Sequence, residues 1–317
     1  MLKEKIENAL NESRILALVA EVMLGFEYQT VFQPGFRRLT APTQHLRLIG
    51  LFCMLLAMAL FLAPAVYHQI VQAGHLSEKL NRFVSKVTTV GLIPFAVALG
   101  IDVYTVSERV LPPFFAVVTG VLSLLTAFCF WYGMEMMVLY REKRREKESP
   151  TMEDRPTELK DRIKFVLMEA RVVLPGAQAL LGFQFAAVLT DSFEKLPGAL
   201  KMVHLGSLLS VAFCTILLMT PAAYHRIVEH GDSTERMEAL SRRMVLASMA
   251  FLAPGIAGDV LIVTERVVHS MSMATTAGGL TLSAFYGFWF GYMIFLRARN
   301  RETTERPGLS SPPLPGK

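Results

Sequence analysis

Residues Val110–Met134 read VLPPFFAVVTGVLSLLTAFCFWYGM, without one acidic or basic side chain. A helix of about 20 apolar residues is long enough to cross the hydrocarbon core of a bilayer. Val268–Leu296 contains His269 but no Asp, Glu, Lys or Arg, and Leu48–Gly74 contains His68 but likewise none of these four residues. Hydrophobic residues make up 52% of the chain and charged residues 19%, below the roughly 25% of soluble proteins. The sequence therefore predicts an all-α integral membrane protein whose first partner is the lipid bilayer.

Composition and motifs also argue against several classes of protein. The net charge is +5, but no basic stretch is interleaved with aromatic residues, so we expect no nucleic-acid binding. The sequence contains no Walker loop, GxSxG or Rossmann fingerprint, so we expect no enzyme, no catalytic residues and no cofactor. Cys53, Cys129 and Cys214 stand singly in apolar runs, and no HxxxH spacing occurs, so we expect no metal site. The polar N-terminus predicts no cleaved signal peptide.

The chain repeats itself. Residues 12–140 match residues 169–297 at an almost constant offset of 157, and we call these ranges the first and second copy. Several matched positions are charged, so the match does not rest on hydrophobicity. The matched segments include Pro64-Ala65-Val66-Tyr67-His68 with Pro221-Ala222-Ala223-Tyr224-His225, Val106-Ser107-Glu108-Arg109-Val110 with Val263-Thr264-Glu265-Arg266-Val267, and, at an offset of 158, Phe130-Trp131-Tyr132-Gly133 with Phe288-Trp289-Phe290-Gly291.

Each copy contains four candidate membrane spans, which predicts eight transmembrane helices in two parallel four-helix repeats. The first span of each copy is the weakest, because Glu21 and Glu27 fall in it and it could instead lie on the membrane surface. The spans lie near 15–34, 46–67, 87–108 and 114–139, and near 172–190, 203–224, 244–264 and 270–296. The predicted domains are a first membrane repeat at 1–140, a charged cytoplasmic linker at 141–168, a second membrane repeat at 169–297 and a disordered cytoplasmic tail at 298–317.

The distribution of Lys and Arg favours eight spans over six. With eight spans, one side of the membrane holds 25 of the 32 basic residues, whereas six spans would divide them equally. Because basic residues concentrate on the cytoplasmic side, we expect both termini in the cytoplasm. An even number of spans per copy makes the two copies parallel. The other side would hold Arg37, Arg38, Arg47, Arg109, Lys195, Lys201 and Arg266.

The second copy resembles a family of small bacterial four-helix membrane proteins that is catalogued as a domain of unknown function. The resemblance rests on Glu169-Ala-Arg171, Gln178, Leu181-Gly182-Phe183 and Pro221-Ala-Ala-Tyr224-His225-Arg226. In the first copy, Glu21 replaces Gln178 and Gln69 replaces Arg226. Some family members carry an automatic sodium:proton antiporter label. The resemblance implies a fold and a multi-pass location in the bacterial inner membrane, and it supplies no functional residues.

Ionisable groups inside the predicted spans are the functional candidates, because burial of each costs roughly 2.5–3.5 kcal/mol. Asp102 and Asp259 lie on the third spans, and each is followed seven residues later by an arginine. An Asp and an Arg at that spacing share a helix face about 10 Å apart, so we expect each to pair with another helix or with water. The pattern fits a carboxylate proton or cation site, or polar contacts that hold helices together. The candidate residues are Asp102, Glu108, Arg109, Asp259, Glu265 and Arg266.

Glu21 and Glu27 are candidates in the first copy alone, because the second copy has Gln178 and Gln184 at the matched positions. Glutamine reproduces the hydrogen bonding of glutamate but not its proton exchange, so the two copies are not equivalent if ions move. Glu21 and Glu27 lie about 120° apart on a helix and do not face one narrow path. His68 and His225 are interpreted as helix-ending residues in water, with a pH sensor as the alternative.

The sequence thus leads to two functional hypotheses. The first is transport of protons or monovalent cations through the intramembrane carboxylates. The second is a non-transporting structural or regulatory membrane protein that scaffolds a partner. The matched halves suggest that single-copy relatives dimerise, while assembly of this chain into a homo-oligomer stays open.

Overall fold

The computed structural model describes residues 2–72, 75–133, 156–227 and 234–304, and every regular element in these ranges is a helix. This confirms the predicted all-α class. Local signals set the helix starts. The Thr40 hydroxyl accepts a hydrogen bond from the Thr43 amide at 3.3 Å and caps α2. Ser77 does the same for α3 by accepting from the Leu80 amide at 3.2 Å.

The elements follow the duplication. The first copy comprises α1 (Leu2–Thr30), the 3-10 helix η1 (Pro34–Arg38), α2 (Ala41–Ile70), α3 (Glu78–Glu108), α4 (Pro113–Phe128) and the π-helical turn η2 (Cys129–Gly133). The second copy comprises α6 (Pro156–Ala187), α7 (Asp191–Glu194), α8 (Gly198–Ile227), α9 (Glu235–Val268), α10 (Met271–Tyr286), the π-helical segment η3 (Gly287–Tyr292) and α11 (Met293–Thr304).

The irregular elements also recur at matched positions. The short helices η1 and α7 both join the first long helix of a copy to the second. The π-helical segments η2 and η3 both fall on the aromatic-glycine motif.

Within the described ranges, seven helices are long and apolar enough to cross a membrane. They correspond to all the predicted spans except the first, at 15–34. The helix α1 is not among the seven, because its apolar sequence is interrupted by the charged residues Glu12, Arg14, Glu21 and Glu27. Its counterpart α6 qualifies over Val166–Ala187. The chain is therefore a helical protein with several helices of the length and composition of membrane spans, which indicates a multi-pass membrane protein.

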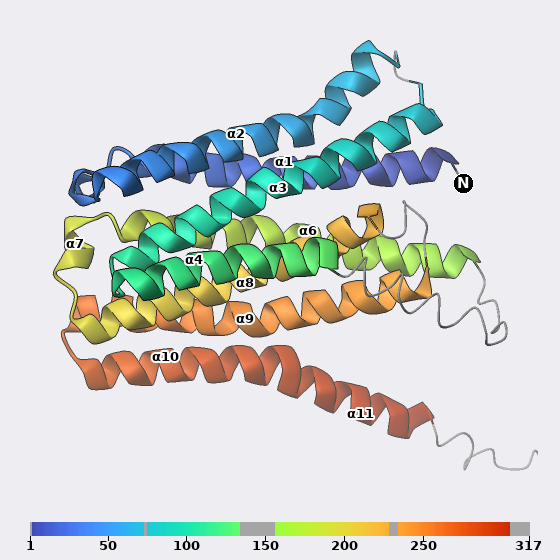
Figure 1. Ribbon diagram of the computed structural model, residues 1–317. Helices are drawn as coiled ribbons and strands as arrows, with labels where there is room; N and C mark the ends of the chain where they lie inside the picture. The colour runs from blue at the N-terminus through green and yellow to red at the C-terminus, as the bar shows by residue number, and fades with distance from the viewer. Residues whose placement is uncertain (1, 73–74, 134–155, 228–233, 305–317) are drawn as a thin grey trace, which may run out of the picture. The chain divides into compact units, whose positions relative to one another are not determined.

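The helices form two compact units, residues 1–255 and 256–317, and the division falls within α9. In the first unit, α1 packs against α2, α3 and α6, while α8 packs against α3, α6 and η2 (Figure 1). Helices of both copies thus share one unit, because α1 and α8 each contact the other copy. The second unit contains the end of α9, then α10, η3 and α11.

The contact between α1 and α6 joins equivalent residues of the two copies. The rings of Phe26 and Phe183 lie 4.8 Å apart, edge to face. Gly182 leaves space for the Phe26 ring, since a side chain there would overlap it. Fourteen residues earlier on α1, Glu12 interacts electrostatically with Arg171 of α6. Contacts at matched levels near both ends of the pair place α1 and α6 parallel and in register.

Trp131 fixes a second contact between the copies. Its side chain is fully buried, and its indole Nε1 donates a hydrogen bond to the Ile216 carbonyl of α8 at 3.1 Å. The neighbouring Phe130 ring packs against Phe213, also of α8, at 5.6 Å. The aromatic-glycine motif of the first copy therefore anchors η2 to the second copy.

Large apolar side chains cover the outward faces of α2 and α4. A water-soluble monomer rarely exposes so continuous an apolar surface, whereas a lipid-facing helix requires it. The exposed residues include Leu48, Ile49, Phe52 and Leu56 on α2, and Phe114, Phe115, Val117, Val121, Leu122 and Leu125 on α4.

The predicted linker and tail are described in part. Within the linker 141–168, residues up to 155 lie outside the described ranges and α6 begins at Pro156. Within the tail 298–317, α11 continues to Thr304, so the first residues of this segment are helical. Residues 305–317 lie outside the described ranges, and with them most of the predicted disordered tail.

Gly35 offers a test of the contact between the copies. Its amide donates a hydrogen bond to the Leu189 carbonyl at 2.8 Å, and a Cβ atom would lie 2.4 Å from that oxygen. Because the Leu189 backbone, unlike a side chain, cannot rotate away from the added methyl group, we expect Gly35→Ala to lower the free energy of unfolding by about 1–3 kcal/mol. The measurement is thermal unfolding in detergent. Gly176→Ala is the control, since its Cβ would meet nothing within 4 Å. Equal midpoints for both variants would contradict this contact.

Candidate functional site

A buried ion pair lies at the centre of the first copy. Asp102 of α3 is fully buried, and its carboxylate pairs with the guanidinium of Arg47 on α2, which is 6% exposed. Arg47 also donates a hydrogen bond to the Thr30 hydroxyl of α1 at 2.6 Å. One arginine therefore links the first three helices of the copy. Arg47 is one of the basic residues expected on the outer side, and no local sequence signal predicts its burial against Asp102.

Glu27 completes the cluster. It is 4% exposed and lies one helical turn before Thr30, whose hydroxyl donates to the Glu27 backbone carbonyl at 2.7 Å. Among the described residues, no donor reaches either carboxylate oxygen of Glu27. Arg47 is near enough for an attractive charge interaction with Glu27. We call Glu27, Thr30, Arg47 and Asp102 the inner cluster. It contains one cation and two carboxyl groups, of which Asp102 forms an ion pair with Arg47 and Glu27 interacts with Arg47 only at longer range.

The second copy replaces three of the four members. At the matched positions, Gln184 stands for Glu27, Ala187 for Thr30 and His204 for Arg47. The His204 Nε2 lies 3.1 Å from the Gln184 carbonyl oxygen, so this nitrogen carries the hydrogen and donates it. Asp259 is retained and is half-buried on the part of α9 that belongs to the second unit. The charged cluster is thus a property of the first copy.

Glu108 and Arg109 contact other elements rather than Asp102. The Thr43 hydroxyl of α2 donates to Glu108 Oε2 at 2.7 Å. The Arg109 guanidinium pairs with Glu194 of α7. The expectation that Asp102 and Arg109 would each find a partner on a different helix holds for both. Their matched residues Glu265 and Arg266 lie in the second unit, half-buried and exposed, respectively.

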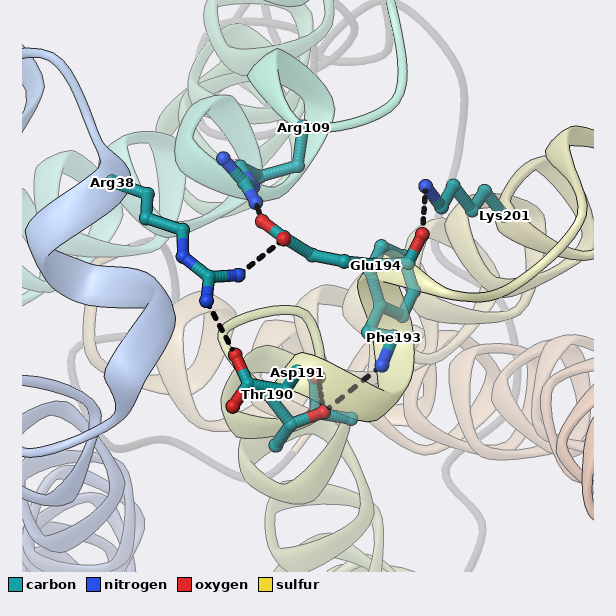
Figure 2. Close-up of polar contacts among 8 residues, drawn as sticks. Arg38, Arg109, Thr190, Asp191, Phe193, Glu194 and Lys201 are labelled. Carbon is teal, nitrogen blue, oxygen red and sulfur yellow. Dashed lines mark hydrogen bonds and ion pairs between the residues drawn. The ribbon is translucent and has the colours of Figure 1, made fainter.

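Arg109 belongs to a network at the end of the bundle where η1 and α7 lie, which we call the outer clamp (Figure 2). Glu194 of α7 accepts from Arg109 and also from Arg38 of η1. Arg38 pairs in addition with Asp191 at 2.8 Å. Lys201 donates to the Glu194 carbonyl at 3.0 Å. The clamp joins the two copies through partly exposed charges, which contribute less per pair than buried ones.

Glu21 is separated from Glu27, as the helical spacing predicts. Glu21 is exposed at a shallow depression lined by the apolar side chains of Leu24, Tyr28, Leu51 and Leu55. Glu27 faces the opposite direction, into the bundle. These two carboxylates therefore do not share a site. Within the described ranges, no group of three or more His, Cys, Asp or Glu side chains could hold a metal ion.

The interpretation of His225 as a helix-ending residue in water was wrong. His225 of α8 and Glu12 of α1 are each 1% exposed, and Nδ1 lies 2.6 Å from Glu12 Oε1. Local sequence could not reveal this pair, because its two residues are 213 positions apart. The matched His68 is only half-buried, and Glu169, which matches Glu12, is exposed. The helix-end interpretation failed because α1 covers the end of α8.

The inner cluster makes a prediction about stability. Asp102→Asn leaves the Arg47 charge buried without its counter-ion, and loss of one partner of a buried pair costs about 3–5 kcal/mol. We expect a large fall in the thermal midpoint in detergent. Asp259→Asn is the matched control, with a smaller effect because Asp259 is only half-buried. Equal losses for the two variants would show that the Arg47 contact contributes no stability of its own.

A family model matches this chain twice, over residues 2–135 and 153–293, and its description is "Family of unknown function (DUF6328)". Two consecutive matches are consistent with two tandem copies of one unit. No curated protein and no solved structure matches the sequence. Because the family model covers most of its length, the chain belongs to the DUF6328 family of unknown function.

Proposed function

We propose that this protein is a multi-pass membrane protein that moves protons across the bilayer through its first copy. The observation that carries the proposal is Glu27, a buried carboxyl whose oxygens accept no hydrogen bond within the described residues. Burial without a hydrogen-bond donor favours the neutral, protonated form of a carboxyl group. The carboxylate that forms when the proton leaves readily binds a proton again. Intramembrane carboxyl groups of this kind mark proton relays in pumps and transporters.

The proposed topology has eight spans, with α1 as the first. Two observations support the inclusion of α1. It lies parallel to and in register with α6, which has the length and composition of a span. Glu12 and Glu27 of α1 face the protein interior rather than the surface. The asymmetry in Lys and Arg then supports cytoplasmic termini, and the bacterial inner membrane is the location that the family resemblance favours.

The surroundings of Glu27 favour a proton over a metal cation. Na⁺ or K⁺ would need several oxygen ligands, and the nearby Arg47 guanidinium would repel it. A proton needs only one carboxylate oxygen. In this scheme Asp102 is not the carrier that its position in the sequence suggested, because Arg47 engages it. Asp102 instead holds Arg47 in place beside Glu27.

A structural or regulatory role is the second candidate, and the outer clamp favours it. Arg38 and Arg109 both converge on Glu194, and they join the two copies without any need for ion movement. On that view the buried charges of the first copy serve to hold helices in register. The two candidates differ in what they predict for Glu27, whose carboxylate accepts no hydrogen bond within the described ranges.

Proton flux in proteoliposomes tests the proposal. The internal pH is followed with a dye while a pH gradient or a gradient of Na⁺, K⁺ or Li⁺ is imposed. We expect flux with the unmodified protein and flux at the level of empty liposomes with Glu27→Gln. The variant should fold, because the second copy carries glutamine at the same position. Glu21→Gln is the control and should retain flux, since Glu21 faces away from the cluster.

Two results would contradict the proposal. Equal flux in Glu27→Gln and the unmodified protein would exclude Glu27 as the carrier. No flux from a well-folded unmodified protein under any of these gradients would favour the structural role. Flux that requires one of the metal cations would mean that the protein exchanges that cation for protons rather than moving protons alone.

A further inference from the structure

We propose that Glu12 and His225 form a second proton-binding site, built from one residue of each copy. The Nδ1 of His225 lies 2.6 Å from Glu12 Oε1, and both side chains are 1% exposed. The carboxylate accepts the Nδ1 hydrogen, which leaves Nε2 as the basic nitrogen of the neutral imidazole. Within the described residues, Nε2 has no hydrogen-bond partner. The pair therefore has a free position for one proton.

The charges around the pair allow that proton to bind. Arg171 of α6 is half-buried and interacts with Glu12, so a guanidinium adjoins the carboxylate and imidazole of the pair. Glu169, also on α6, is exposed and does not enter the site. On α1, the Ser13 hydroxyl donates to the Phe61 carbonyl of α2 and so does not compete for Glu12.

A small cavity lies beside Glu12. It has a volume of about 20 Å³, and its walls include Glu12, Arg171, Leu174, Leu218 and Pro221. About 10–15 Å³ is enough for one water molecule when polar partners are present, and Glu12 and Arg171 supply them. A water at this point would join the carboxyl of Glu12 to the surroundings.

Proton uptake by the pair involves one proton and no other change in bonding. The carboxylate and neutral imidazole become either a carboxylate with an imidazolium or a carboxylic acid with a neutral imidazole. Because both forms keep the hydrogen bond between Nδ1 and Oε1, the contact between α1 and α8 persists during uptake and release. The site binds a proton without separating the two copies.

The position of the site suggests its place in transport, a step that rests on the proposed function. Glu12 and Glu27 are separated along α1 by about 22 Å, near one end and the other of the shared bundle. Gln178 of α6 lies at an intermediate level, fully buried, and neither atom of its amide is hydrogen-bonded within the described residues. A proton held by Glu12 and His225 would thus reach Glu27 along the contact between α1 and α6.

Histidine nitrogen resonances test the site without any need for flux. The full-length protein with ¹⁵N-histidine is placed in lipid bilayers, and the spectrum is recorded over a range of pH. The His225 signals are assigned by their loss in His225→Gln. We expect the His225 signals to change with pH and the midpoint of that change to move in Glu12→Gln, because this variant removes the carboxylate that contacts Nδ1. Glu169→Gln is the matched control and should leave the midpoint unchanged.

Each outcome decides between the two proposals. A His225 signal that does not change with pH, or a midpoint that Glu12→Gln leaves in place, would overturn the second site. A midpoint that depends on Glu12, in a protein that shows no proton flux, would uphold the site and remove its role in transport. If Glu12→Gln fails to fold, Glu12→Asp withdraws the carboxylate from the imidazole and should also move the midpoint. No shift in that variant would also overturn the site.

Discussion

Burial of a charged side chain inside a helix bundle is costly unless an opposite charge is buried with it. Arg47 and Asp102 meet this condition together, and neither could occupy its position without the other. Because Arg47 also binds Thr30, the pair sets the relative positions of α1, α2 and α3. In this arrangement the Glu27 side chain is buried in the interior of the bundle. Helix α1 also packs against α6.

The duplication then explains why the molecule has one charged cluster rather than two. Equivalent residues meet where α1 and α6 pack in parallel, as Phe26 and Phe183 show. The second copy keeps the helices of the first but replaces Glu27 and Arg47 with Gln184 and His204. His204 is hydrogen-bonded to the Gln184 carbonyl. A fused pair can specialise one half in this manner, whereas two identical subunits cannot. The outer clamp and the Glu12–His225 pair add polar contacts between the copies near opposite ends of the bundle.

The fold class, the long helices and the duplication could be predicted, because apolar length and matched motifs are properties of the sequence itself. The partners of the buried charges could not, because they depend on which helices pack together. Arg47 lies near the start of an apolar span, where a basic residue usually faces water outside the membrane. No local sequence pattern indicates a contact with Asp102. The burial of His225 required α1 to cover the end of α8. The separation of Glu21 from Glu27 was predictable, since helical geometry alone determines it.

The central claim is that Glu27 exchanges a proton inside the protein. Infrared difference spectra of the protein in lipid bilayers, recorded between two pH values, detect a carboxyl group as it gains a proton. The account predicts a carboxylic-acid band that disappears in Glu27→Gln and remains in Glu21→Gln. A spectrum that Glu27→Gln leaves unchanged would mean that Glu27 keeps a single protonation state, and the inner cluster would then be a structural device.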